Sequence, residues 1–255
     1  MHDERAVDDP AGQRCFARMA GILAIVSAPL ALASLFVALP AVDYDMATLT
    51  NMMLFLRTGA RGAASGRWAM VLDMFGYYLM IAPATMLLGR SLAKQGGGLW
   101  VELCTGCVLV YVVVGAVGAA VLSAVLPPLM TAYARAAASD RATIEVVYRA
   151  VTDTVYGGMW NIFEEIVAGV GWFGLGWFIR ARRPRLGVLT MLLGLGCLVD
   201  GFGNVVGAKA VADVGLYVYL LLAPAWAAWV GLAQLPSRAA AITRPPTRPL
   251  PPASR

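Results

Sequence analysis

The sequence predicts an all-α membrane protein, a polytopic bundle of six transmembrane helices, and composition and hydropathy are the two observations behind this prediction. The chain of 255 residues is 60% hydrophobic and 14% charged, and its mean hydropathy is +0.71. Soluble domains have about 25% charged residues, so a soluble globule of this size cannot bury so much apolar surface. A soluble enzyme, a nucleic-acid-binding domain and a disordered regulator are therefore excluded. The pI near 9.2 does not indicate that nucleic acid is a partner, because the basic residues are scattered between apolar runs.

Six apolar stretches are long enough to cross a bilayer core, which takes about 20 helical residues. They cover residues 19–39, 68–88, 99–126, 157–179, 186–207 and 214–235. The first stretch has about 21 apolar residues, whereas the apolar part of a signal peptide has about 7–15, so we expect a true span. The predicted organisation is listed in chain order: an N-terminal cytoplasmic tail at residues 1–18, a transmembrane domain at residues 19–235, and a disordered tail rich in proline and arginine at residues 236–255.

The distribution of basic residues predicts the orientation of the bundle. With six spans both termini share one side, and that side has 13 Arg and Lys residues against 7 on the other. Cytoplasmic segments have the excess of Lys and Arg, so both termini are predicted to be cytoplasmic. Arginine supplies 18 of the 20 basic residues, a bias typical of GC-rich bacterial genomes. We therefore expect a multi-pass protein of the bacterial cytoplasmic (inner) membrane, with the lipid bilayer as its first partner.

Two external segments have apolar residues at helical spacing. These residues are Met46, Leu49, Met53 and Leu56 in the first segment and Ile144, Val147, Val151 and Val155 in the second. Each segment is predicted to be either a short amphipathic helix on the membrane surface or an extension of the adjacent span.

The residue inventory excludes several kinds of chemistry, and we predict no cofactor and no catalytic residue. His2 is the only histidine and lies outside every predicted span, so bis-histidine haem and histidine-ligated zinc are not available. Cys104 and Cys107 form a C-x-x-C motif near the cytoplasmic end of the third span. A redox role for this motif stays open beside a packing role, since buried cysteine is common as a small apolar residue.

Acidic residues inside the predicted spans are the main functional signal. Asp73, Glu164, Glu165 and Asp200 lie within about 10 Å of the external ends of their spans, at 1.5 Å per residue. Glu102 begins the third span at the cytoplasmic interface. An ionisable residue in a span costs about 2.5–3.5 kcal/mol on insertion scales and therefore faces the bundle interior or a cavity. Without a cation at the same depth, at least some of the four external acids are expected to hold a proton.

Three of these acids have a second polar side chain one helical turn away, on the same predicted face. The pairs are Asp73 with Tyr77, Glu165 with Asn161, and Asp200 with Asn204. If these faces meet, they line an acidic pocket open to the external side. Such a pocket would bind a metal ion, an organic cation or a protonated solute, or would relay protons. The alternative is structural, because protonated acids and amides also form hydrogen bonds between membrane helices, worth about 0.6 kcal/mol each.

Two parts of the chain resemble a bacterial family of small six-helix membrane proteins classified as a domain of unknown function. Residues 17–23 resemble the R-x-A-G entry to that family's first span. Residues 183–189 and 194–202 resemble its P-x-x-L-G-x-L and G-x-G-Y-L-x-D-S-F motifs, with Cys197 in place of the Tyr and Gly201 in place of the Ser. The resemblance implies a six-helix protein of the bacterial inner membrane and draws attention to Asp200. It implies no activity and no catalytic residues.

These observations together favour a protein that binds or transports a small solute, a cation or a proton through an externally facing acidic pocket. Pro29, Pro83 and Pro224 interrupt the first, second and sixth predicted spans, as is common in helices that line cavities. The first alternative is a non-catalytic accessory, assembly or sensor protein. The second is a membrane enzyme that acts on lipid, which the absence of histidine beside the outer acids disfavours.

Overall fold

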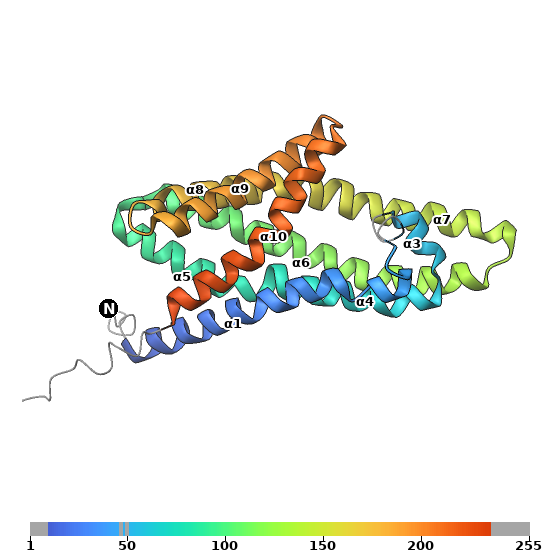
Figure 1. Ribbon diagram of the computed structural model, residues 1–255, viewed down its shortest axis with the longest axis horizontal. Coiled ribbons are helices and arrows are strands. Elements are labelled where there is room, and N and C mark those ends of the chain that lie inside the picture. The colour runs from blue at the N-terminus through green and yellow to red at the C-terminus, as the bar shows by residue number, and fades with distance from the viewer. Residues whose placement is uncertain (1–9, 46–47, 49–50, 236–255) are drawn as a thin grey trace, which may run out of the picture.

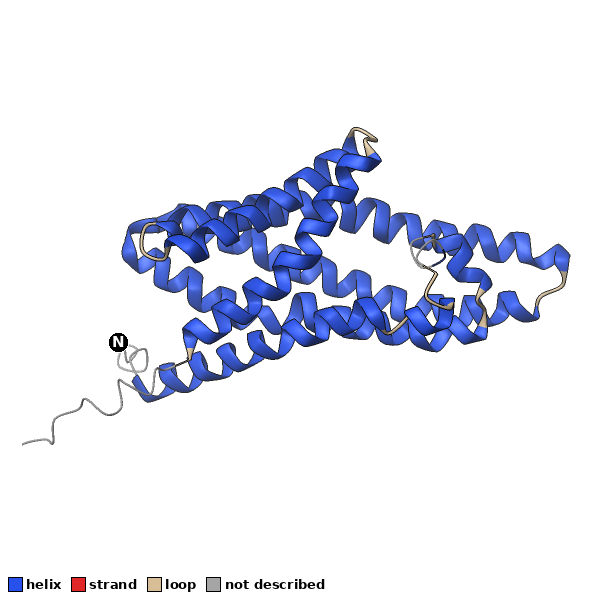
Figure 2. Cartoon of the chain, in the orientation of Figure 1, coloured by secondary structure: helices blue, strands red, loops and turns tan. Residues whose placement is uncertain are grey.

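The computed structural model describes residues 10–45, 48 and 51–235, and all regular elements in these residues are helices (Figures 1 and 2). This confirms the predicted all-α class. The elements in chain order are α1 (Pro10–Phe36), η2 (Leu39–Val42), α3 (Met52–Arg57), α4 (Ala60–Asp73), η3 (Met74–Tyr78), η4 (Leu79–Ile81), α5 (Ala82–Leu92), η5 (Ala93–Gly97), α6 (Gly98–Arg135), α7 (Ala138–Thr152), η6 (Asp153–Glu164), α8 (Glu165–Arg180), α9 (Pro184–Val205) and α10 (Lys209–Gln234). The predicted tail at residues 236–255 lies outside the described residues.

Five helical runs in the described chain are long and apolar enough to cross a membrane, and one of them contains two of the predicted spans. This run covers Ala60–Arg135. Within it, Gly96 and Gly98 have φ of 102° and 47°, a backbone conformation that glycine adopts without steric cost. The chain reverses there, so α4 and α5 pack along α6. The arrangement is therefore compatible with the six predicted crossings.

Several helices are longer than predicted, and the molecule is elongated (Figure 1). Helix α1 begins at Pro10, within the predicted N-terminal tail. Helix α6 has 38 residues, which span about 57 Å at 1.5 Å per residue. A bilayer core is only about 30 Å thick. Helix α6 therefore continues beyond the lipid at the end of the molecule where α3 and α7 lie.

The two external segments differ in structure. The second is an extension of the fourth span, because α7, η6 and α8 form one continuous helical run over Ala138–Arg180. The first contains the separate short helix α3, which packs against α6 and α7. The Asn51 side chain caps α3 by accepting hydrogen bonds from the backbone N–H groups of Met53 and Leu54, at 3.0 and 3.2 Å. Met46 and Leu49 lie outside the described residues.

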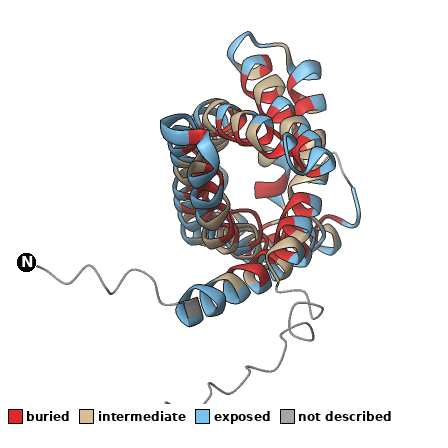
Figure 3. Cartoon of the chain, turned by 90° about the vertical axis from the view of Figure 1, so that its left-hand side faces the viewer, coloured by how far each residue is buried: buried red, intermediate tan, exposed pale blue. Residues whose placement is uncertain are grey.

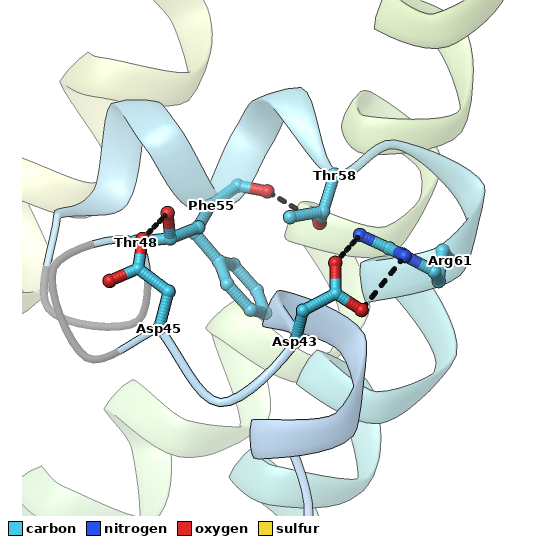
Figure 4. Close-up of polar contacts among 6 residues, drawn as sticks. All are labelled: Asp43, Asp45, Thr48, Phe55, Thr58 and Arg61. Atoms are coloured by element: carbon cyan, nitrogen blue, oxygen red, sulfur yellow. Dashed lines mark hydrogen bonds and ion pairs between the residues drawn. The ribbon is translucent and has the colours of Figure 1, made fainter.

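An ion pair joins the chain after α1 to the start of α4 (Figure 4). The Arg61 guanidinium donates to both carboxylate oxygens of Asp43, at 3.3 and 3.0 Å. Both side chains are exposed, so the pair contributes little to stability. Nearby, the Thr48 hydroxyl donates to Asp45 at 2.7 Å. The Thr48–Asp45 bond is local to the first external segment, and the Arg61–Asp43 pair connects that segment to the start of α4.

The helices pack around two apolar cores, and buried positions turn toward the middle of the ring of helices in an end-on view (Figure 3). The first core includes Trp172, Leu193 and Trp226, in the part of the bundle where α8, α9 and α10 lie. The second includes Leu122 and Tyr148, in the extended end formed by α3, α4, α6 and α7. The extended end is therefore a packed unit of its own, continuous with the spanning bundle.

The three prolines within predicted spans act differently. Pro29 and Pro224 lie inside α1 and α10, which continue through them. Pro83 lies in the first turn of α5, directly after the π-helical η3 and the 3-10 helix η4. Of these three spans, only the second is thus irregular beside its proline, and its irregular part begins directly after Asp73.

Candidate acidic site

The four predicted acids lie on neighbouring elements near the junction of the two cores. Asp73 ends α4, Glu164 ends η6, Glu165 begins α8, and Asp200 lies in the last part of α9. Glu164, Glu165 and Asp200 have exposed fractions of 2%, 4% and 2%, and Asp73 is half-buried. Burial of this depth is rare for acidic side chains.

The structure brings these acids close enough to interact electrostatically. Asp73 interacts with Glu164, Glu164 with Glu165, and Glu165 with Asp200. We call this series of four carboxyl groups the acidic row. No lysine or arginine of the described chain forms an ion pair with any member of the row; Lys209, near Asp200, binds Asp213 instead, at 2.7 Å. Within the described residues, the row is therefore a set of buried and half-buried acids without counter-ions.

Each member of the acidic row has one buried oxygen without a hydrogen-bond partner among the described residues. These atoms are Asp73 Oδ2, Glu164 Oε2, Glu165 Oε2 and Asp200 Oδ2. An unpartnered buried polar atom costs about 1–3 kcal/mol, so unpartnered atoms in a native structure need an explanation. Four such atoms in one series make the acidic row the candidate site of this structure.

One of the three predicted polar pairs is confirmed by hydrogen bonds. The Asn204 side-chain amide donates to Asp200 Oδ1 at 2.7 Å and to the Asp200 backbone carbonyl at 3.0 Å. Both residues lie on the regular helix α9, where positions four apart share a face. Asp200 is therefore held in a fixed orientation.

The other two pairs are not formed, because both lie beside π-helical segments. Asn161 belongs to η6 and its side chain makes no hydrogen bond with a described residue. In a π-helix the backbone bonds run to the fifth residue, so Asn161 and Glu165 are not aligned as in an α-helix. Tyr77 lies in η3, and its hydroxyl donates to the Leu220 carbonyl of α10 at 3.2 Å; its interaction with Asp73 is electrostatic, without a hydrogen bond.

Tyrosines that the sequence analysis did not single out surround the acidic row. The Tyr78 hydroxyl is in side-chain contact with Glu164. The hydroxyls of Tyr111 and Tyr219 are 2.7 Å apart, and Tyr111 also donates to the Tyr77 backbone carbonyl at 2.9 Å. The adjacent Tyr77 and Tyr78 in an apolar span were the available signal for this network. Their partners come from α6 and α10 and could not be paired from spacing.

Cys197 also lies beside the acidic row. Its thiol contacts the Glu165 carboxyl group between α8 and α9. A thiol is a weak hydrogen-bond donor, so Cys197 satisfies part of Glu165 while its Oε2 stays unpartnered. This is a polar role at the position where the resemblance noted above has a tyrosine.

Two of the three π-helical segments in the described chain, η3 and η6, adjoin the acidic row. η3 follows Asp73 directly, and the 12-residue η6 ends at Glu164. π-Helical turns are rare and are frequent at functional sites. The local widening of the helix therefore coincides with the acids on both the second and the fourth spans.

The acidic row is not arranged as a metal site. In the residues that the structure describes, no three histidine, cysteine, aspartate or glutamate side chains form a group able to hold a metal ion. Two surface hollows, of about 470 and 220 Å³, are lined by other residues. The larger follows α7 and the smaller lies between η5 and the end of α8. The predicted opening of the site to the external side stays a prediction.

Comparisons of this chain with protein-family models, with curated proteins and with solved structures find no match. The resemblance to the six-helix family of unknown function therefore also stays a prediction.

Proposed function

We propose that this chain is a multi-pass protein of the bacterial cytoplasmic membrane that binds protons reversibly at the acidic row. The observation that supports this most is the series of four carboxyl groups, each with one buried, unpartnered oxygen and none with a counter-ion among the described residues. A buried carboxyl group without a cation favours its neutral, protonated form. Ionised carboxylates that lie close together repel one another. The four carboxyl groups of the row therefore bind protons as a coupled group.

The arrangement favours a proton over the other ligands that the sequence left open. A metal ion needs several converging ligands, and the described residues provide no such group. A proton needs only one unpartnered oxygen and a neighbour to pass it to. Glu164 contacts Tyr78, and Glu165 contacts Cys197, so hydroxyl and thiol groups lie between the acids as donors and acceptors.

The position of the row suggests how protons reach it. Asp200 lies five residues before the end of α9 at Val205, which is about 8 Å along the helix. This end is opposite the arginine-rich turn between α8 and α9, and we place it on the external side. Protons would exchange between the row and this side, which is the arrangement expected for a proton-coupled carrier.

Infrared difference spectroscopy of the purified protein tests proton binding directly. Protonated carboxyl groups have a carbonyl stretch that disappears on ionisation, so spectra taken in acid and alkaline buffer should differ in this band. We expect Glu164→Gln and Asp200→Asn each to remove part of the band. Glu102→Gln is the matched control, because Glu102 is an exposed acid outside the row, and its removal should leave the buried signal unchanged.

Proteoliposomes test whether the bound protons move. A trapped pH-sensitive dye should report proton flux under a potassium diffusion potential, with loss of flux in Glu164→Gln and Asp200→Asn but not in Glu102→Gln. If no band titrates and flux equals that of empty liposomes, proton binding is wrong. The acids would then be structural, and the accessory, assembly or sensor function would become the better proposal.

A further inference from the structure

A cleft lies at the end of the bundle that is opposite the extended end. It lies between the chain reversal at η5 and the turn between α8 and α9. It has a volume of about 220 Å³ and is lined by residues of η5 and by the end of α8. The lining residues are Leu92, Gln95, Gly96, Gly97, Trp177, Phe178, Ala181 and Arg182. One wall is therefore formed by two glycines with a leucine and a glutamine, and the other is mainly aromatic and basic.

The surroundings of this cleft are strongly cationic. The guanidinium of Arg180 lies over the ring of Trp177, 4.3 Å from its centroid, and Arg182 lines the cleft itself. Among the described residues this end of the molecule has one acid, Glu102, which is exposed. The cations at this end are Arg14, Arg18, Arg90, Lys94, Arg180, Arg182, Arg183 and Arg185. None of them forms an ion pair with another described residue.

The backbone of η5 is open at Gly96, one of the two glycines that line the cleft. Gly96 and Gly98 have positive φ, and no atom lies within 4 Å of the position that a Cβ would take at either residue. Helix α6 begins there without a side-chain cap, so its first N–H groups are not satisfied by a side chain. Backbone N–H groups at a helix start favour an anion, and they add to the charge of Arg180 and Arg182.

Apolar side chains beside the cleft are exposed where lipid would contact them. Leu99, Trp100 and Trp177 have exposed fractions of 80%, 70% and 53%. Tryptophan is enriched at membrane interfaces, where its ring lies at headgroup level. A ligand in the cleft would therefore have a charged part among the arginines and an apolar part along α6 and α8.

We propose that this cleft binds the headgroup of an anionic phospholipid, with the phosphate held by Arg182 and Arg180 and the acyl chains against Leu99 and Trp100. Basic clefts between membrane helices on the cytoplasmic side bind anionic headgroups in this way. Arginine binds phosphate in a bidentate geometry, and the contact of Arg180 with Trp177 orients it beside the cleft. This site is independent of the acidic row, so either proposal can fail alone.

Thermal unfolding and native mass spectrometry of the full chain in detergent test this site. The probes are phosphatidylglycerol, phosphatidylcholine with the same acyl chains, glycerol phosphate and inorganic phosphate. We expect phosphatidylglycerol to remain bound and to raise the unfolding temperature, whereas phosphatidylcholine does neither. Arg180→Gln/Arg182→Gln should weaken phosphatidylglycerol binding by about tenfold or more, since hydrogen bonds to charged groups are lost.

The matched control is Arg183→Gln/Arg185→Gln, which removes the same charge at the same end without changing a residue of the cleft. If this control variant still binds phosphatidylglycerol, the result supports binding in the cleft. Equal loss in both double variants would show attraction to the basic surface in general and would overturn the proposal. Equal stabilisation by inorganic phosphate or glycerol phosphate would identify a free phosphate as the ligand and overturn the lipid assignment.

Discussion

The hydroxyl of Tyr77 donates a hydrogen bond to the backbone carbonyl of Leu220, 3.2 Å away on α10. Leu220 is four residues before Pro224, and proline has no N–H to donate to that carbonyl. Tyr77 therefore replaces the helical donor that Pro224 removes. This contact allows α10 to continue through its proline and joins the sixth span to the second, beside Asp73.

Replacing Tyr77 with phenylalanine should destabilise the protein only where Pro224 is present. We expect Tyr77→Phe to lower the free energy of unfolding by about 1 kcal/mol, because the Leu220 carbonyl loses its donor. In the Pro224→Ala background the alanine N–H supplies the helical bond, and the same change should cost close to nothing. Denaturant unfolding of the four proteins of this cycle measures the coupling. Tyr217→Phe, at an exposed position of α10, is the control, and equal costs in both backgrounds would contradict the explanation.

Much of the fold could be predicted from hydropathy, because lipid requires long apolar helices and little else in a sequence imitates them. The extended end was only partly predictable. Helix α6 continues to Arg135 through Pro127 and Pro128, whereas proline and falling hydropathy predicted the end of the span at residue 126. The helix persists because Leu122, Leu126 and Met130 pack in the second core, and such tertiary packing is not visible in local sequence.

The acidic site, like the fold, could be predicted only in part from the sequence. Insertion cost and helical rise predicted that Asp73, Glu164, Glu165 and Asp200 lie at a similar depth, and left open whether their helix faces meet. The partners of these acids were predicted from α-helical spacing, which holds for Asn204 on the regular helix α9. It fails at Asn161 and Tyr77, because η6 and η3 are π-helical. No residue pattern in those segments distinguishes a π-helix from an α-helix.

Adding a methyl group at Gly115 should disturb the site through Tyr78. A Cβ at Gly115 would lie within the Tyr78 ring, which packs directly on α6. We expect Gly115→Ala to destabilise the protein by about 1–3 kcal/mol, the usual cost of overpacking a core. It should also alter the carboxyl band of Glu164, because Tyr78 has to move.

Gly106→Ala on the same helix is the matched control, since no atom lies within 4 Å of its Cβ position. Alanine favours the helix by about 1 kcal/mol over glycine, so Gly106→Ala should be neutral or stabilising. If the two variants have the same unfolding temperature in a thermal scan, the result would contradict the close contact between Gly115 and Tyr78.

The predicted orientation can be tested with one native cysteine and one introduced cysteine. Cys15 is exposed near the start of α1, whereas Cys104 and Cys197 are buried. Ser139 is exposed in the first turn of α7, at the extended end. A membrane-impermeant maleimide added to intact cells should label Ser139→Cys in a Cys15→Ser background. It should label Cys15 of the parent chain only after the membrane is opened, and the reverse pattern would invert the bundle.

Replacing Glu165 with leucine should separate the functional role of the acidic row from a structural one. Glu165 is 4% exposed and its Oε2 has no partner, so its burial costs free energy that no contact fully returns. An unpartnered buried polar atom costs about 1–3 kcal/mol, and an apolar residue of similar volume removes this cost. We therefore expect Glu165→Leu to unfold at the same or a higher temperature while part of the titrating carboxyl band and the proton flux are lost.

Glu165→Gln should lose the same function without gaining stability, because it still buries a polar group. A clear loss of stability in Glu165→Leu with proton flux intact would instead show that Glu165 joins α8 to α9 by hydrogen bonding, and the acidic row would then be part of the packing.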